Sequence, residues 1–361
     1  MKKSFIKFID RYLGTILVFK LYFFSLFKRK SKEINNILVI MFWGIGSNVN
    51  SSPILKALRR KYPKAKITIL IPKKNKDLFF NNKYIDDKLF LNLNVGPLIK
   101  LLISKRNKFD LVVDTEHWLN ISAIISYFLG KERVGFSNRI RSILYTDKVK
   151  FDKTKHAVIN NLNLVNGVEP ELEKIKCSNE NKRFVNNFFK KNKVKGFIIG
   201  LGVGTGKTVP ERRWPEENFS RLADKLVEKY KAKIVLVGSK REIPLMNKIK
   251  SLMKNNAFVS GFDLGKTIYL IEKCKLFIGN DGGPMHIAAA QGVKTIGLFG
   301  PETPVIFGPF NKNNISLFKG IECSPCIKIY EGKYMKCKYK ENKCLKLISV
   351  GEVLRAVGKL G

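Results

Sequence analysis

Short apolar runs alternate with longer amphipathic stretches along the chain after residue 35. Ile37–Phe42 and Ile67–Ile71 are continuous apolar runs, and Asp110–Asp114 has an apolar centre between two acids. Runs of this kind are typical of parallel strands that are buried on both faces. Glycines follow the first run, and Pro53–Tyr62 then places apolar side chains at helical spacing. This order of strand, turn, helix and strand predicts a βαβ unit in a parallel sheet.

The same alternation starts again at Gly196. The strands predicted in this second half are Phe197–Leu201, Lys233–Gly238, Leu276–Asn280 and Thr295–Gly300. A helix is predicted over Glu216–Tyr230, and the charged stretch Cys177–Lys195 is predicted to be a helix between the two halves. We therefore expect an α/β protein with two doubly wound, Rossmann-like domains that face each other across a cleft. The expected domains cover residues 36–180 and 195–345, and a final helix is expected over 346–361.

Residues 1–35 differ from the rest because basic residues flank an apolar run at both ends. The run, Tyr12–Phe27, has about 16 residues with Lys20 near its middle, whereas a helix that spans a bilayer needs about 20. A basic amphipathic helix on the anionic inner face of the cell membrane fits this pattern. Two alternatives remain open, a helix that packs on the protein's own surface and a true membrane span. No small-residue cleavage site follows the run, so we expect a cytoplasmic protein that is peripheral on the membrane.

The charge of the chain is strongly positive. Its 361 residues include 68 Lys and Arg against 29 Asp and Glu, which gives a formal net charge of +39. Such an excess fits a nucleic acid, an anionic membrane surface or a phosphorylated substrate. The lysines are spread along the whole chain, and no zinc-finger, RNA-recognition or basic-zipper motif is present. We therefore expect no nucleic-acid partner, although charge alone keeps nucleic-acid binding as an alternative.

The motif with the clearest chemistry is Gly279–Ala290, which lies between a predicted strand and a predicted helix. Gly282 and Gly283 allow the backbone to approach a ligand closely, and the following helix directs its N-terminus at that ligand. A diphosphate fits such a site. Asp281 can hold a sugar hydroxyl or orient the loop, and His286, one turn into the helix, can donate to a phosphate. The alternative is a plain strand-to-helix turn with a buried polar network.

The longer stretch Gly279–Pro309 resembles the nucleotide-sugar signature of glycosyltransferase family 9, the heptosyltransferases. An Asp, two small residues and a His at the start of an Ala-rich helix are followed by the loop Phe299–Pro304. Arg212–Pro215 is similar to the family's basic-x-Trp-Pro element, and Asn36–Pro63 is similar to its first βαβ unit. The resemblance covers most of the chain and leaves out the first thirty-odd residues and the cysteine-rich segment.

The resemblance implies an inverting glycosyltransferase with the two-domain GT-B architecture. It implies a nucleotide-diphosphate sugar as donor, with ADP-heptose as the family's donor, and a lipid-linked saccharide such as the lipopolysaccharide core as acceptor. No cofactor is required, because a helix N-terminus and basic side chains can stabilise the leaving diphosphate. By the same resemblance, Thr205, Lys207 and Thr208 contact phosphates and sugar, Arg212 replaces the usual Lys, and Glu242 holds the ribose.

The general base is where the chain departs from the family. The family places an Asp after a glycine in the first turn, but this acceptor-side turn reads Gly46, Ser47 and Asn48 here. Neither Ser nor Asn ionises usefully near pH 7, so neither can take a proton as a carboxylate does. The base that we favour lies after the strand Asp110–Asp114, where the candidate residues are Glu116, with Asp114 and His117 behind it.

Two other interpretations of these residues remain open. Asp114 can cap the following helix while Glu116 is solvated, which is a structural role for both. Alternatively, the chain is a weak or inactive transferase that only binds a sugar nucleotide and a membrane.

Six cysteines are present, and four of them lie close together near the C-terminus. Their spacing is Cys323-x2-Cys326-x10-Cys337-x6-Cys344, in which the first pair resembles a zinc-binding pair. The sequence thus predicts a possible structural zinc site. The alternative is four reduced thiols, or a disulfide, in a surface loop. In a reducing compartment we expect mostly free thiols.

Overall fold

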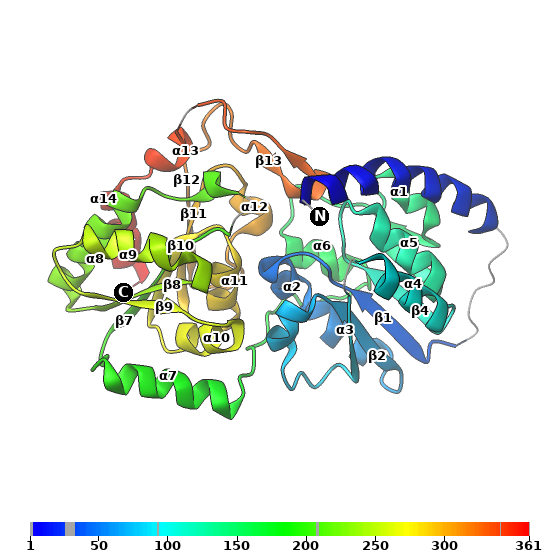
Figure 1. The fold of residues 1–361 in the computed structure, drawn as a ribbon, viewed down its shortest axis with the longest axis horizontal. Helices are drawn as coiled ribbons and strands as arrows, with labels where there is room; N and C mark the ends of the chain where they lie inside the picture. Colours follow the sequence, from blue (N-terminus) through cyan, green and yellow to red (C-terminus); the bar gives the residue numbers. More distant parts are fainter. Residues whose placement is uncertain (1–2, 26–32, 92–93, 207–208, 340, 361) are drawn as a thin grey trace. The chain divides into compact units, whose positions relative to one another are not determined.

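A computed structural model describes residues 3–25, 33–91, 94–206, 209–339 and 341–360 of the protein. The chain divides into two compact units, each with its own sheet (Figure 1). Unit 1 contains residues 1–76, 82–170 and 329–333, and unit 2 contains residues 77–81, 171–328 and 334–361. The chain thus passes from unit 2 into unit 1 and back within the cysteine-rich segment.

Unit 1 is built on a parallel sheet of six strands in the order β3-β2-β1-β4-β5-β6. The strands are β1 (Asn36–Ile40), β2 (Lys66–Ile71), β3 (Asp87–Phe90), β4 (Phe109–Asp114), β5 (Gly130–Phe136) and β6 (Asp147–Val149). In the central register Val39 lies opposite both Ile69 and Val113. These strands are rich in Val, Ile and Leu because helices cover the sheet on both faces.

The helices of unit 1 form two groups. They are α1 (Lys3–Ser25), α2 (Ile45–Ser51), α3 (Pro53–Lys61), α4 (Val95–Ser104), α5 (Asn120–Leu129) and α6 (Ala157–Asn163), with 3-10 turns η1 (Lys73–Phe79) and η2 (Ile140–Leu144). Both α1 and α4 pack on α5, whereas α6 packs on α2 and α3. Leu38 and Ile40 of β1 share a core cluster with Ile125 and Leu129 of α5.

Helix α1 is attached to unit 1 by one of its faces. The Asp10 carboxylate accepts hydrogen bonds from the amides of Asn120 (3.1 Å) and Ile121 (2.7 Å) at the start of α5, so it caps that helix. Gly14 lies against Asn120, where a Cβ would be 3.1 Å from its side chain, and Val18 is fully buried. One face of the helix therefore packs on the protein's own surface. In the described residues, no helix is both long and apolar enough to cross a membrane.

Unit 2 repeats the architecture with a second parallel sheet in the order β12-β11-β10-β7-β8-β9. Its strands are β7 (Ile198–Gly202), β8 (Lys233–Gly238), β9 (Ala257–Gly261), β10 (Leu276–Asn280), β11 (Lys294–Phe299) and β12 (Asn314–Phe318). Its helices are α7 (Asn179–Lys191), α8 (Glu216–Tyr230), α9 (Ile243–Ser251), α10 (Leu264–Glu272), α11 (Gly283–Ala290), α12 (Pro304–Phe307), α13 (Lys343–Lys346) and α14 (Val350–Leu360).

Shorter elements complete this half of the chain. They are the 3-10 turns η3 (Pro210–Arg212), η4 (Lys240–Glu242) and η5 (Ile329–Glu331) and the two-residue strands β13 (Ile327–Lys328) and β14 (Lys333–Tyr334). Helix α14, the predicted final helix, packs on α8, and its Val353, Ala356 and Val357 belong to the core of unit 2. Helix α7, predicted between the halves, belongs to unit 2 and packs on α10.

The two sheets have the same strand order when each is numbered from its own first strand, with β7 corresponding to β1 and β10 to β4. Both follow the doubly wound pattern in which the direction of winding reverses between the first and fourth strands. The prediction of two Rossmann-like domains, the GT-B architecture, is therefore confirmed. Ligands in such sheets bind in the crevice beyond the carboxyl ends of the two strands at the reversal.

One predicted turn is wrong. Gly46, Ser47 and Asn48 were expected in a turn after β1, but α2 already begins at Ile45. Gly44 is the extended N-cap residue, and the amide of Asn48 donates to its carbonyl at 3.1 Å. Glycines disfavour helix only weakly, and the packing of α2 on α6 overrides that preference here.

Candidate functional site

In unit 2 the doubly wound fold predicts a ligand crevice beyond β7 and β10, and Asn280 at the end of β10 fixes the two loops there. Its Oδ1 accepts a hydrogen bond from the amide of Trp214 (2.8 Å), and its Nδ2 donates to the carbonyl of Val203 (2.8 Å). Trp214 is itself fully buried and donates its indole N–H to Ile348. Asn280 was not predicted as a site residue, although a polar side chain at the end of an apolar strand is a usable signal.

Arg212 lies between two buried acids in the same crevice. Its Nη1 is 3.0 Å from Oδ2 of Asp281, and its Nη2 is 3.4 Å from Oε2 of Glu302. Burial raises the pKa of the Asp281 carboxyl, and the charge of Arg212 acts in the opposite direction. The planar guanidinium can engage both carboxylates at once, which fixes its orientation. Asp281, predicted to hold a sugar or orient the loop, thus orients Arg212, and Glu302 is a partner that the sequence did not indicate.

These two acids outnumber the single guanidinium, so Arg212 cannot attract a diphosphate by itself and other groups must contribute. Gly282 is the N-cap residue of α11 and Gly283 is its first residue, so the helix begins at the carboxyl end of β10 with amides that have no acceptor inside the helix, apart from Pro284, which has no N–H. His286, in the first turn, is buried. Two more predicted donor-binding residues, Lys207 and Thr208, lie outside the described residues.

Glu242 closes the crevice beside the glycine-rich loop that follows β7. Its Oε1 accepts from the amide of Gly206 (3.0 Å), and its Oε2 accepts from the amide and the hydroxyl of Ser239 (both 2.8 Å). A Cβ on Gly204 would lie 1.9 Å from Oε1 of Glu242, so any larger residue here would force this carboxylate to move. The neighbouring Thr205 donates its hydroxyl to the Val209 carbonyl at 2.9 Å. Several predicted donor-binding residues therefore lie together in unit 2.

The corresponding crevice of unit 1 contains Glu116. Its Oε1 accepts hydrogen bonds from the amides of Phe42 (2.5 Å) and Trp43 (2.9 Å), both in the loop after β1. Among the described residues, no hydrogen bond to its second oxygen, Oε2, is found. Burial, followed by the negative charge of Asp114, raises the pKa of the Glu116 carboxyl to about 7. Such a group changes its charge near neutral pH, as a general base must.

Asp114 supports Glu116 from the end of β4. One of its oxygens accepts from the Glu116 amide (3.0 Å), while the other accepts from the Tyr145 hydroxyl (2.7 Å) and pairs with Arg141 (3.1 Å). All these groups are buried. The alternative in which Asp114 caps the next helix and Glu116 is solvated is therefore wrong, because Asp10 caps α5 instead.

The contacts of His117 and of the start of α2 indicate structural roles. The centroid of the His117 ring lies 5.0 Å from that of Phe136 and 4.9 Å from that of Phe151. Burial lowers the pKa of His117 to about 3. It therefore stays neutral at physiological pH. Asn48 donates to the Met41 carbonyl (3.2 Å) and accepts from Asn75 (3.0 Å), so it holds the loop after β1. Ser47 is half-buried in the first turn of α2.

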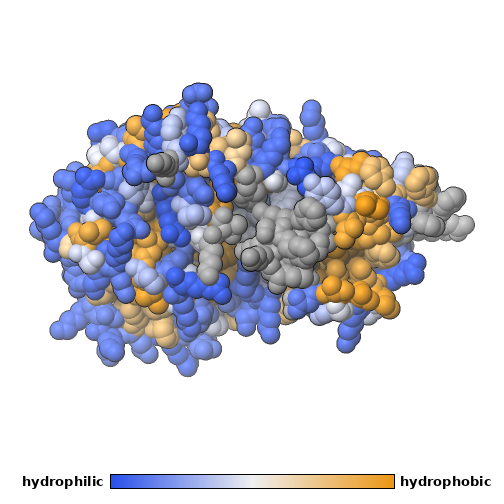
Figure 2. Space-filling model, turned by 45° about the horizontal axis from the view of Figure 1, so that its top comes forward, coloured by the Kyte–Doolittle hydropathy of each residue, from blue (hydrophilic) through white to orange (hydrophobic). Residues whose placement is uncertain are grey.

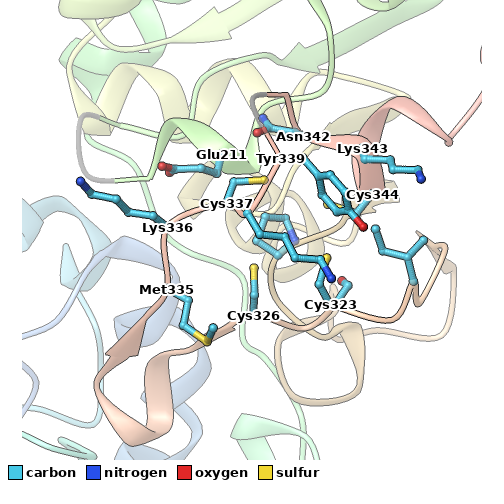
Figure 3. A pocket seen from close by; sticks show the side chains of 14 residues that line it. Glu211, Cys323, Cys326, Met335, Lys336, Cys337, Tyr339, Asn342, Lys343 and Cys344 are labelled. Atoms are coloured by element: carbon cyan, nitrogen blue, oxygen red, sulfur yellow. The ribbon is translucent and has the colours of Figure 1, made fainter.

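The four clustered cysteines line one pocket of about 220 Å³ in unit 2 (Figure 3). The other lining residues include Glu211 and Pro301, which neighbour Arg212 and Glu302 in the chain. All six cysteines are free thiols, and burial raises the pKa of the Cys344 thiol to about 11. Within the described ranges, no three His, Cys, Asp or Glu side chains are grouped closely enough to hold a metal ion. The donor chemistry suits zinc, but the spacing of the thiols does not match a formed site.

Comparison with known proteins identifies related sequences and folds. The model of glycosyltransferase family 9 (heptosyltransferase) matches residues 99–336. Lipooligosaccharide heptosyltransferase 2 of Campylobacter jejuni is 26% identical over 336 residues, which cover 88% of this chain and 96% of that protein.

Two solved structures share the fold over most of the chain. The crystal structure of a family 9 glycosyltransferase from Veillonella parvula has a TM-score of 0.78 and 24% identity, covering 92% of this chain and 99% of that one. The ADP-heptose lps heptosyltransferase II of Escherichia coli has a TM-score of 0.70 and 20% identity, and the match covers 90% of this chain and 98% of that one.

Proposed function

This chain belongs to glycosyltransferase family 9, and we propose that it transfers heptose from ADP-heptose to a saccharide of the lipopolysaccharide core or a related lipid-linked glycan. The observation that carries the proposal is the crevice of unit 2. There the glycine start of α11, the oriented Arg212 and the carboxylate of Glu242 converge around a position suited to a nucleoside diphosphate.

The choice of donor and acceptor is supported by the relatives. The Escherichia coli structure is named for ADP-heptose, and the Campylobacter jejuni relative is a lipooligosaccharide heptosyltransferase. Glu242, which already accepts two amide hydrogen bonds, is proposed to hold the ribose hydroxyls. The acceptor is anchored in the inner leaflet, so we place the enzyme on the cytoplasmic face of the membrane.

The proposed reaction is one in-line displacement. An acceptor hydroxyl oxygen attacks the anomeric carbon, the bond from that carbon to the diphosphate oxygen breaks, and the configuration inverts. ADP leaves with the bonding electrons, and its charge is stabilised by the amides that start α11 and by Arg212. Glu116 takes the proton of the attacking hydroxyl on Oε2, while its Oε1 stays bound to the Phe42 and Trp43 amides. Asp114 is a positioning residue that fixes Glu116 and tunes its pKa.

Calorimetric titration with ADP and UDP, followed by transfer assays with ADP-heptose, tests the proposal. We expect ADP to bind at least about tenfold more tightly than UDP, since a site built for one base leaves polar groups unpaired with the other. Transfer to a deep-rough lipopolysaccharide acceptor then identifies the reaction. Tighter binding of UDP would contradict the donor assignment, and tight ADP binding without transfer would contradict the enzymatic role.

We also propose that Cys323, Cys326, Cys337 and Cys344 hold one structural zinc when the thiols close together. The support is that all four line one pocket. Burial, followed by the charge of neighbouring cysteines, raises the pKa of the Cys326 and Cys344 thiols, and a bound cation would oppose this effect. Metal analysis of protein purified under reducing conditions should find about one zinc per chain. Cys326→Ser should lose the metal, whereas Cys274→Ser, a buried cysteine outside the segment, should keep it. Metal-free wild-type protein with an unchanged melting temperature after zinc addition would contradict this proposal.

A further inference from the structure

Helix α1 has two faces with different environments. Asp10, Gly14, Val18 and Leu21 lie on the face that packs on unit 1. The side chains at the opposite positions of the helical turn are large, apolar and exposed, and they are Tyr12, Ile16, Phe19 and Phe23. The side chain of Phe23 is the most exposed of the four, at 69%. An apolar stripe that faces water on a helix with a fixed inner face indicates that another apolar phase covers it.

Helix α4 carries a second stripe of the same kind. Val95, Ile99 and Ile103 recur every four residues and are exposed, and Ile103 is 73% exposed. Leu98 and the following leucines of the helix pack inward on the core cluster of the sheet. Helices α1 and α4 both pack on α5, so the two stripes are carried by neighbours of the same helix of unit 1. Figure 2 shows apolar side chains gathered on part of one side of the molecule.

Basic side chains accompany both stripes. On α1, Arg11 and Lys20 are exposed beside the apolar stripe, while the only acid of the helix, Asp10, is buried. Helix α4 contains Lys100 and no acid, and exposed basic residues follow it at Arg106 and Lys108. A helix with an apolar stripe bordered by cations alone is suited to the interface of an anionic bilayer, where lysines reach the head groups.

We propose that the exposed stripes of α1 and α4 form one docking face for an anionic lipid bilayer. A second copy of the chain is a poorer occupant, because it would bring the same cations against this face. The choice of a bilayer rests on the proposed function, whose acceptor is membrane-anchored, but vesicle binding itself requires no sugar transfer. The face would hold unit 1 at the surface where a lipid-linked acceptor is found.

Flotation of the full chain with vesicles tests the docking face. One set of vesicles is phosphatidylcholine alone, and the other contains about one third phosphatidylglycerol. We expect flotation with the anionic vesicles, little with the neutral ones, and a clear decrease as salt rises.

Variants then locate the surface. Ile16→Gln combined with Phe23→Gln should weaken vesicle binding about tenfold or more, because two apolar side chains that would enter the bilayer are lost from the contact. Ile103→Gln should weaken it less. The control is Val168→Gln, which changes an equally apolar residue of unit 1 that is 88% exposed and belongs to neither helix. It should bind vesicles as the wild type does. All changed side chains point to solvent, so unchanged melting temperatures confirm that the variants fold.

Three results would overturn the proposal. The first is equal binding to neutral and anionic vesicles, and the second is equal binding by the α1 variant and the Val168 control. The third is a wild-type dimer in sedimentation velocity that the α1 variant abolishes while vesicle binding persists, since a second copy then covers the face. Calorimetric ADP binding should be the same in every variant, so loss of docking and failure of the proposed donor site are separate outcomes.

Discussion

The crevices of the two units show the same anchoring device with different chemistry. In each sheet, a polar side chain at or just after the end of the fourth strand binds the loop that follows the first strand. In unit 2 this residue is Asn280, which holds the Val203 carbonyl, and in unit 1 it is Glu116, which holds the Phe42 and Trp43 amides. The strand order of the two sheets is the same, so the difference lies in the side chain.

The difference separates a purely structural anchor from one that can also take a proton. An amide both donates and accepts and never titrates, so Asn280 holds its loop at every pH. A buried carboxyl only accepts when it is ionised, and the pKa of Glu116 is raised to about 7. Unit 2 therefore combines a fixed frame with the charged groups of the proposed donor site, whereas unit 1 has a titratable group two residues after the end of the corresponding strand.

The largest expected effect comes from removing the titratable group while keeping the anchor. Glu116→Gln retains an acceptor oxygen for the two amides but cannot take a proton, so kcat should fall about 10²- to 10⁴-fold. ADP affinity, measured by calorimetry, should not change. In the wild type, kcat/KM should rise with pH and level off above about pH 7, where Glu116 is ionised, and this limb should vanish in the variant.

A Glu116→Ala variant is the matched control for the anchor. It should lose the same activity and, in addition, lower the melting temperature, because two buried amides lose their acceptor. Full activity in Glu116→Gln would place the base elsewhere and reduce Glu116 to the structural role that Asn280 has.

The next effect concerns the charged group of unit 2. Arg212→Gln should weaken ADP binding about 10²-fold, because it removes a cation near the diphosphate and leaves Asp281 and Glu302 without their partner. Arg221→Gln, on the exposed side of α8, is the control and should bind ADP as the wild type does. Arg212→Lys should recover part of the affinity. Equal ADP affinity in all three variants would show that Arg212 serves the fold alone.

An effect of similar size is expected in the pH dependence of stability. The folded-state pKa of Glu116 is raised from 4.5 to about 7, so its contribution is fully present below pH 4.5 and is lost as pH rises toward 7. Relative to Glu116→Gln, the wild-type free energy of unfolding should therefore fall by about 3 kcal/mol over this window. Urea denaturation at several pH values measures it. A difference between the two proteins that is independent of pH would contradict the raised pKa.

Asn280→Asp carries the same test into unit 2. The new carboxylate cannot donate to the Val203 carbonyl and is buried, so its pKa should be raised. The variant should accordingly be most stable at acidic pH, where the protonated acid can still donate, and should lose stability as pH rises. If the unfolding free energy of Asn280→Asp changes with pH only as much as that of the wild type, the loop rearranges instead.

Both sheets and the strand-to-helix motif before α11 could be predicted from the sequence because their signals are local. Apolar runs between amphipathic helices define buried parallel strands, and the glycines before α11 are contiguous in the chain. The remaining contacts join distant residues. Asp10 caps α5 across 110 positions, and Arg141 reaches Asp114 across 27. The periodicity of the sequence does not indicate pairs of distant residues. The buried contacts of Arg141 and Tyr145 with Asp114, beside Glu116, could therefore not be predicted.

The start of α2 shows a different limit. Gly44 and Gly46 indicated a turn, yet only Gly44 is outside the helix, because packing on α6 decides the conformation of the residues that follow. The sequence rules for glycine describe an isolated segment, and tertiary contacts changed the outcome here.

Glycines in the two crevice loops give the smallest and most local test of the comparison. A methyl group on Gly204 of unit 2 would lie 1.9 Å from Oε1 of Glu242, whereas one on Gly44 of unit 1 meets no atom within 4 Å. Gly204→Ala should displace the Glu242 side chain from the Gly206 amide and weaken ADP binding about tenfold, with a stability loss of about 1 kcal/mol. Gly44→Ala should leave ADP binding unchanged and alter stability by a few tenths of a kcal/mol.

Calorimetric titration and thermal unfolding of the two variants measure both quantities. If Gly204→Ala binds ADP as tightly as the wild type, Glu242 does not contact the nucleotide. If both variants lose ADP affinity equally, the nucleotide is held by both loops, and the division of labour between a donor crevice in unit 2 and a proton-accepting crevice in unit 1 fails. A loss confined to Gly204→Ala supports that division, because only the unit 2 loop then requires a glycine for ligand binding.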